Sequence, residues 1–171
     1  MTKKILLTSF TTWRPHQKSN SSDDLLIEVA KDNSLSASLT FLRQLPVDIE
    51  QAISQAIAQI DKLNPDLIIS CGMAEKRGIL TVESNARLNN HLIETSVDLH
   101  KLITGLKQTG ISHDAGKFVC EGLYYSMLKY LRDRQLKTPC IFVHVPLLSP
   151  QNLRDIKANF VEIVYRLTLL A

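Results

Sequence analysis

Three short apolar runs constrain this sequence more than any other feature. They lie at Lys3–Phe10, Leu67–Cys71 and Pro139–Val145, and their composition is typical of buried strands. Between the first two, Val47–Leu63 carries isoleucines at spacings of four, four and three, which predicts an amphipathic helix. Apolar strands that alternate with helices predict an α/β protein, a three-layer α/β/α sandwich around a mostly parallel, mixed central sheet.

The remaining segments complete this pattern. Thr11–Asp24 is polar and predicts a loop that leads into a capped helix at Leu25. The other expected elements are strands or extended pieces over Leu35–Leu45 and Leu80–Arg87, and helices over Asp98–Thr109, Lys117–Arg134 and Ser149–Leu169, the last with Pro150 in its first turn. There is no repeat and no linker, so we expect a single domain over residues 1–171.

Composition excludes several classes of function. The chain has 171 residues, of which 44% are hydrophobic, so it can bury a core without metal or disulfide. A net charge of +3, without a block of like charges, does not indicate a nucleic-acid partner. No apolar run reaches the length of a membrane-spanning helix, and the start has only three consecutive apolar residues, too few for a secretory signal peptide.

The cysteines and histidines point to a reducing compartment and no metal. Cys71, Cys120 and Cys140 are odd in number and contain no CxxC pair, which indicates free thiols and a cytoplasmic protein. The five histidines form no HExxH or HxH pattern, so we expect neither a metal site nor a cofactor.

Three residues have the chemistry of a nucleophilic site. His144 closes an apolar strand, where catalytic groups gather in open α/β sheets, although alone it is better explained as a core histidine. Cys120 falls in the first turn of an expected helix, where the helix dipole lowers a thiol pKa, but buried cysteines are also ordinary core residues. Glu83 could orient an imidazole or be solvated, and spacing alone cannot bring the three together.

Several segments resemble a known family. Ser112–Cys120, read as S-H-D-A-G-K-F-V-C, resembles the nucleophile segment S-N-x-A-G-x-[FY]-[VL]-C of pyroglutamyl peptidase type I, the pyrrolidone-carboxylate or C15 cysteine peptidases. Gly72–Ala86 is similar to the family's G-Q-A-x-x-R-x-x-I-T-x-E-x-x-A tract, and Ile141–Pro146 to its F-I-H-V-P strand. The resemblance runs in order over nearly the whole chain.

The resemblance implies a phosphorylase/hydrolase-like fold and a Glu83–His144–Cys120 triad. His144 would accept the thiol proton, Cys120 would attack the carbonyl of an N-terminal pyroglutamyl residue, and Glu83 would hold the imidazole tautomer. The substrate would be a peptide or small amide, no cofactor would be needed, and the chain could form a homo-oligomer. We expect His144 within hydrogen-bond reach of the Cys120 sulfur, and Glu83 at the other ring nitrogen.

The departures from the family concern the substrate pocket, which we expect to contain Phe10, Trp13, Met73, Phe118 and Val119. Trp13 replaces a phenylalanine, the loop glycines are absent, and Met73 replaces the glutamine that contacts the pyroglutamyl ring in the family. The segment between Glu83 and Cys120 is shorter, and Ile93 occupies the place of an arginine. These changes predict weak or no turnover of pyroglutamyl substrates. Two alternatives stay open: a hydrolase of another small amide with the same triad, and a non-catalytic binding module that retains the fold.

Overall fold

Six strands form the central sheet, in the order β2-β1-β3-β8-β4-β7. The computed structural model describes residues 2–32 and 34–170. The strands of this sheet are β1 (Lys4–Phe10), β2 (Ser38–Leu45), β3 (Leu67–Met73), β4 (Leu80–Glu83), β7 (Thr109–Ser112) and β8 (Cys140–Val145). β4 runs antiparallel to β8, and every other neighbouring pair is parallel. The sheet is therefore mixed and mostly parallel, as predicted.

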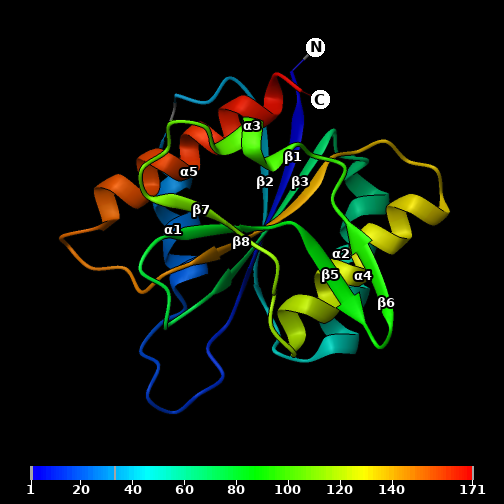
Figure 1. Ribbon diagram of the computed structural model, residues 1–171, viewed down its shortest axis with the longest axis horizontal. Helices are drawn as coiled ribbons and strands as arrows, with labels where there is room; N and C mark the ends of the chain where they lie inside the picture. Colours follow the sequence, from blue (N-terminus) through cyan, green and yellow to red (C-terminus); the bar gives the residue numbers. More distant parts are fainter. Residues whose placement is uncertain (1, 33, 171) are drawn as a thin grey trace.

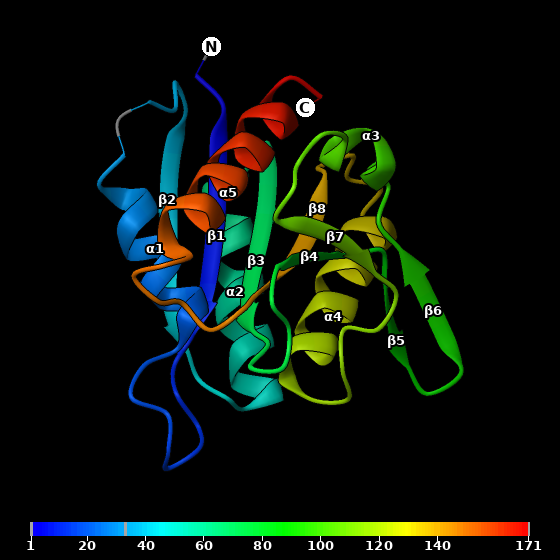
Figure 2. The ribbon, with the colours of Figure 1, turned by 60° about the vertical axis from the view of Figure 1, so that its left-hand side comes forward.

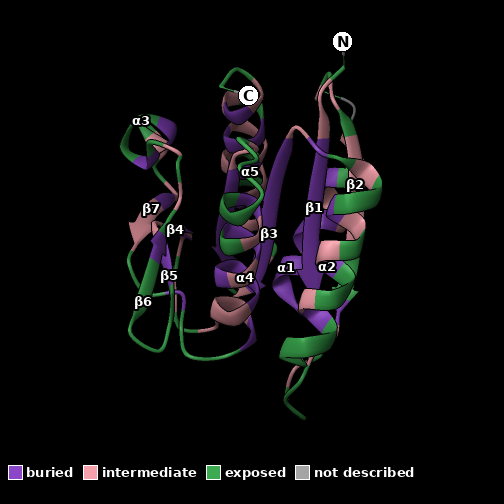
Figure 3. Ribbon diagram, turned by 90° about the vertical axis from the view of Figure 1, so that its right-hand side faces the viewer, coloured by how far each residue is buried: buried purple, intermediate pink, exposed green. Residues whose placement is uncertain are grey.

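Helices cover both faces of this sheet (Figure 1). Helices α1 (Ser21–Ala30) and α5 (Leu153–Thr168) pack on one face, with the short α3 (Leu99–Ile103) at its edge. Helices α2 (Ile49–Leu63) and α4 (Val119–Asp133) pack together on the other face. The predicted three-layer sandwich is confirmed, and Figure 3 shows the strands buried between the helical layers.

The pleat of the strands divides the core into two layers, because successive side chains point to opposite faces. Alternate residues of β1, β3 and β8 pack against α1 and α5, among them Leu7, Ile69 and Val143. The intervening residues, including Leu6, Ile68 and Phe142, pack against α2 and α4. Uniformly apolar strands are therefore needed at the sheet centre, which is why these runs stand out in the sequence.

Two sequence predictions differ from the structure. Leu80–Arg87 is not one extended piece, since β4 ends at Glu83 and a separate hairpin follows, made of β5 (Asn85–Leu88) and β6 (His91–Glu94) beside α4 (Figure 2). The helix expected over Asp98–Thr109 ends at Ile103, because Gly105 adopts a left-handed φ of 80° and the chain then enters β7.

Two helix starts also differ from the prediction. α1 is capped by Asn20, whose side chain accepts from the Ser22 N–H. α5 starts at Leu153, so Pro150 lies in the turn before that helix.

The structure also bears on the expected free thiols, membrane-spanning helices and number of domains. All three cysteines are free. Within residues 2–32 and 34–170, no helix is long and apolar enough to cross a membrane. The single domain stays a prediction, and its residues 1, 33 and 171 lie outside those that the structure describes.

Candidate active site

A buried carboxylate–imidazole pair lies where β4 and β8 run antiparallel. Thr81 is paired in register with His144, and Glu83 with Phe142, so all four side chains share the sheet face toward α4. Oε1 of Glu83 lies 2.6 Å from Nδ1 of His144, and both residues are buried. The antiparallel pairing therefore brings two of the three predicted catalytic residues into direct contact.

The contact fixes the protonation pattern of the pair. Burial raises the pKa of Glu83, but hydrogen bonding and charge from His144, with a further hydrogen bond from Arg77, outweigh it and hold this pKa below its usual range. An ionised carboxylate can only accept, so Nδ1 of His144 carries the hydrogen and donates it to Glu83. In the neutral imidazole with this tautomer, the other ring nitrogen, Nε2, has the lone pair and can act as a base.

The Cys120 sulfur lies over Gly72, the residue of β3 that is paired in register with His144. A Cβ built on Gly72 would lie 2.7 Å from Cys120 Sγ and 3.0 Å from the ring of Phe142. The lack of a side chain at position 72 thus lets the first turn of α4 approach the strand next to His144. The described hydrogen bond of His144 runs from Nδ1 to Glu83. Nη1 of Arg77 lies 3.5 Å from the same Nδ1, but both groups are donors there and do not bond each other. The direct approach of His144 to Sγ stays a prediction.

The thiol differs from the sequence-based expectation. Burial, followed by repulsion from Glu83, raises the pKa of Cys120 to about 12, although the Arg77 charge and the Cys120 backbone N–H act in the opposite direction. The expected lowering by the helix N-terminus is therefore wrong for the resting structure, because burial outweighs it. The nucleophile would rest as a neutral thiol.

Sequence reasoning did not find Arg77 as a partner of the pair. Its Nη1 lies 2.5 Å from Glu83 Oε1 and also bonds the Thr81 hydroxyl. Its Nη2 donates to the backbone carbonyl of Asp114, 2.8 Å away, in the loop that leads into α4. Arg77 therefore joins the carboxylate to the loop before the cysteine. Its place in the family-like tract was the only signal, because the turn that aims it is a tertiary feature.

A cavity of about 390 Å³ opens beside His144. Apolar and polar side chains both line it: Trp13, Met73, Ala74 and Ala115 on the apolar side, and Arg14, Gln17, Glu75, Lys76 and Arg77 on the polar side, with Gly116 between them. The rings of Trp13 and Phe118 lie 5.4 Å apart, and each is about half exposed, at 51% and 48%. Trp13 therefore forms an apolar part of the cavity wall, and Phe118 packs against Trp13 without lining the cavity itself.

Met73 faces away from the cysteine. Its sulfur accepts the Ser21 N–H at 3.4 Å, at the start of α1. Phe10 and Val119, the other residues expected in the pocket, are buried in the core on the α2 and α4 face. Phe10 borders a separate cavity of about 270 Å³ near Asp23 and Arg43.

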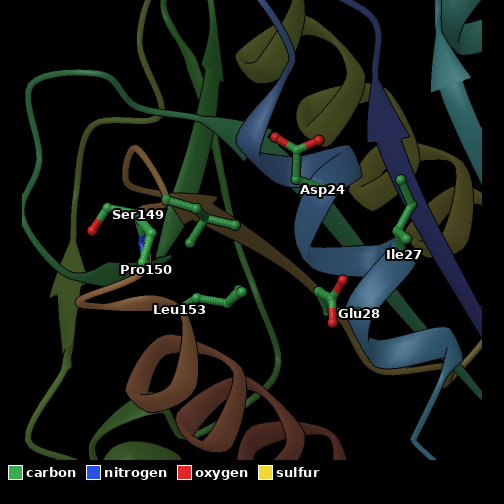
Figure 4. A pocket seen from close by; sticks show the side chains of 7 residues that line it. Asp24, Ile27, Glu28, Ser149, Pro150 and Leu153 are labelled. Atoms are coloured by element: carbon green, nitrogen blue, oxygen red, sulfur yellow. The ribbon is translucent and has the colours of Figure 1, made fainter.

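Another cavity, of about 420 Å³, contains none of the predicted site residues (Figure 4). Asp24, Ile27 and Glu28 of α1 line one side of it, and Ser149, Pro150 and Leu153 line the other.

Comparison with known proteins identifies relatives of this chain. The sequence profile described as pyroglutamyl peptidase matches residues 93–167. A pyrrolidone-carboxylate peptidase of Vibrio vulnificus is 30% identical over 175 residues, covering 87% of this chain and 81% of the relative. One of Brevibacillus brevis is 30% identical over 140 residues, covering 67% of this chain and 65% of the relative.

Solved structures share the fold. Pyrrolidone carboxyl peptidase of Fervidobacterium islandicum superposes with a TM-score of 0.85 at 19% identity, covering 97% of this chain and 98% of that one. Pyroglutamyl peptidase I of Bacillus amyloliquefaciens gives 0.81 at 21% identity, covering 95% of this chain and 93% of that one. The solved structures share the α/β sandwich. The sequence matches identify the class of protein as a hydrolase, and the chain belongs to the pyroglutamyl peptidase family.

The contact at Gly72 gives the first prediction. Gly72→Ala places a Cβ against Cys120 Sγ and Phe142, so we expect a loss of about 1–3 kcal/mol in unfolding free energy through overpacking. Gly78→Ala is the matched control, because a Cβ there meets nothing within 4 Å. Urea unfolding of both variants measures the difference, and equal stabilities would contradict the contact.

The Arg77–Glu83 ion pair gives the second prediction. A carboxyl whose pKa is depressed on folding adds stability above its unfolded pKa, about 4.5 here, and this stability is lost as the pH falls through the folded pKa. Arg77→Met removes one cause of the depression, so we expect a deficit of about 1–3 kcal/mol at pH 7.

The pH dependence tests this origin of the deficit. In Arg77→Met the folded pKa of Glu83 rises, so stability declines from a higher pH than in the wild type, and the gap narrows once Glu83 is protonated in both proteins. Urea unfolding between pH 7 and pH 3 measures it, with Lys76→Met, an exposed neighbour, as control. A deficit that does not change with pH would contradict the ion pair as its cause.

Proposed function

We propose that this chain is a cysteine peptidase of the pyroglutamyl type that uses a Cys120–His144–Glu83 triad. One observation carries the proposal: the Glu83–His144 hydrogen bond of 2.6 Å lies beside Gly72, and the Cys120 sulfur lies over that glycine. A nucleophile, a base and a residue that orients the base are the three groups that acyl transfer needs.

In the first step, Nε2 of His144 takes the proton from the Cys120 thiol while the sulfur attacks the substrate carbonyl. A carbon–sulfur bond forms, and the carbonyl electron pair moves onto oxygen. Glu83 stabilises the imidazolium that results, because its carboxylate already accepts from Nδ1. Since the resting thiol has a pKa near 12, we infer that the thiolate forms by this proton transfer.

The start of α4 can stabilise the oxyanion. Phe118 occupies the N-cap position, and within the described residues no side chain caps this helix. The first-turn N–H groups of Val119 and Cys120 have no partner within the helix, so they can donate to an oxyanion that forms beside Cys120. Collapse of the intermediate breaks the carbon–nitrogen bond, and His144 gives its proton to the leaving amine. Water, deprotonated by His144, then hydrolyses the thioester and restores the thiol.

Positions 13 and 73 favour an acyl group that is more apolar than the lactam of pyroglutamate. Trp13 supplies a ring that packs against Phe118, and Met73 supplies a thioether that accepts from a backbone N–H, while Arg14, Gln17 and Glu75 line the polar side of the same cavity. A pocket that reads a substrate through hydrogen bonds discriminates far better than an apolar one. Another small N-acyl amide, cleaved by the same triad, is therefore the second candidate substrate.

The triad predicts one reactive thiol and two positions, Cys120 and Glu83, where substitution lowers activity. Of the three cysteines, only Cys120 is partly exposed, so we expect iodoacetamide to modify Cys120 before Cys71 and Cys140. Mass spectrometry would locate the label.

The variants are tested on aminoacyl-coumarin substrates. Cys120→Ala should abolish hydrolysis, and Glu83→Gln should lower kcat by about 10³–10⁴ through loss of the imidazole tautomer. Earlier labelling of Cys71 or Cys140, or an active Cys120→Ala, would overturn the proposal.

The thioether at position 73 predicts a gain of pyroglutamyl activity. In Met73→Gln, the side-chain carbonyl can accept the Ser21 N–H as the sulfur does, while the amide N–H₂ becomes available to the ring carbonyl of the substrate. We expect kcat/KM for pyroglutamyl-coumarin to rise about 5- to 10-fold, which corresponds to the net free energy of one hydrogen bond. Met73→Leu keeps the volume without the polar group and is the control. An equal gain in Met73→Leu would contradict the specificity argument.

A further inference from the structure

One carboxylate outside the triad holds the loop between β1 and α1. Oε1 of Glu75 lies 3.0 Å from His16 Nε2 and 3.0 Å from Gln17 Nε2, and its Oε2 lies 3.6 Å from the Arg14 guanidinium. These contacts span nearly sixty positions of sequence, so Glu75 bridges two loops at the same edge of the sheet. Hydrogen bonds from Gln17 and His16 also hold the Glu75 pKa below its usual range, so the carboxylate is charged.

Gln17 is hydrogen-bonded to both Glu75 and Trp13 and so connects the carboxylate with the tryptophan. While its amide N–H₂ donates to Glu75, its carbonyl Oε1 accepts the backbone N–H groups of Trp13 and Arg14, at 3.0 and 3.1 Å. The Arg14 guanidinium in turn lies 4.4 Å from the centre of the Trp13 ring. Two routes therefore connect the Glu75 carboxylate with Trp13, one through Gln17 and one through Arg14.

The loop has few other restraints at this end. Residues 13–16 are exposed, and no glycine or buried apolar anchor lies among them. An ordered loop of exposed side chains needs specific contacts to offset the entropy of fixing it. At the far end, Asn20 closes the loop by donating to the Thr11 carbonyl, so Glu75 supplies the contact near the tip.

Glu75 itself lies on a rigid turn. The Ala74 N–H donates to the Val145 carbonyl at the end of β8, and the Arg77 N–H donates back to the Ala74 carbonyl. The turn is thus tied to the strand that carries His144. A loop fixed to this turn is fixed relative to the catalytic pair.

We propose that Glu75 is a positioning residue that fixes the loop over the site and holds Trp13 against Phe118 as one wall of the acyl pocket. The role of that wall in catalysis rests on the proposed function. The placement of Trp13 by Glu75 does not, and it can be measured separately.

The chain contains a single tryptophan, so fluorescence excited at wavelengths that the four tyrosines do not absorb reports on Trp13 alone. In Glu75→Ala we expect red-shifted emission and an acrylamide quenching constant about 1.5- to 2-fold higher, because a half-exposed ring becomes exposed. Glu75→Gln keeps one carbonyl acceptor and should give a smaller change in the same direction. Glu162→Gln is the matched control, a carboxylate on α5 that also accepts from an arginine, and it should match the wild type.

Further variants test the route to Trp13. Gln17→Ala should raise the quenching constant as well, and the double variant Gln17→Ala/Glu75→Ala should fall short of the sum of the two single effects, because both act on the same contact. Thermal unfolding of each variant checks that the fold is kept. Unchanged quenching in folded Glu75→Ala would overturn the proposal, as would full additivity.

Kinetics separates positioning from a general structural role. We expect kcat/KM for the best acyl-coumarin substrate to fall about tenfold in Glu75→Ala, with the rate of Cys120 alkylation unchanged, because the wall moves and the nucleophile does not. Changed fluorescence with unchanged kcat/KM would overturn the role in specificity. If the chain hydrolyses no acyl amide, the proposed function fails, and the fluorescence still decides whether Glu75 holds Trp13.

Discussion

The close contact between Cys120 and Gly72 is the constraint on which the rest of the site depends. The sulfur occupies space that any side chain at position 72 would fill, so α4 can reach the sheet only over a glycine. β3 also places that glycine in register with His144. The hydroxyl of Tyr124, further along α4, donates to the backbone carbonyl of Glu83 and fixes the helix to β4. Helix α4 therefore contacts both β3 and β4, the strands on either side of the strand that carries His144. Small changes in the position of this helix would act on all three residues of the proposed triad.

The turn between β3 and β4 connects the two halves of the site. Arg77 reaches from it toward the catalytic pair, and Glu75 reaches from it toward the loop that carries Trp13. Because both residues lie on the same turn, which is hydrogen-bonded to the end of β8, the loop of Trp13 and the Glu83 carboxylate are both connected to that strand. Preorganisation of this kind is what a site needs when its groups must align within fractions of an ångström.

Sequence patterns predicted the parts of this structure that depend on burial, and missed those that depend on long-range geometry. The apolar runs of β1, β3 and β8 had to be central strands, since both faces are covered. The antiparallel direction of β4 has no local signal, yet this pairing is what joins Glu83 to His144. The family resemblance supplied the candidate residue types; the contacts of Arg77 and Glu75 could be found only once the chain was folded.

The pKa of Cys120 shows that the direction of a pKa shift can be determined only when the burial and the neighbouring charges of the group are known. The sequence locates Cys120 at a helix start, which favours thiolate, but not how deeply the sulfur is buried or that Glu83 lies near it. Glu83 disfavours the thiolate and favours the imidazolium, so for a proton moving from Cys120 to His144 these two effects oppose each other. What remains is the cost of burying the negative sulfur. In the proposed mechanism, attack on a carbonyl would remove that charge from sulfur and place it on an oxygen beside the N–H groups at the start of α4, which would stabilise it. A neutral resting thiol is therefore compatible with nucleophilic catalysis when proton transfer and attack occur together.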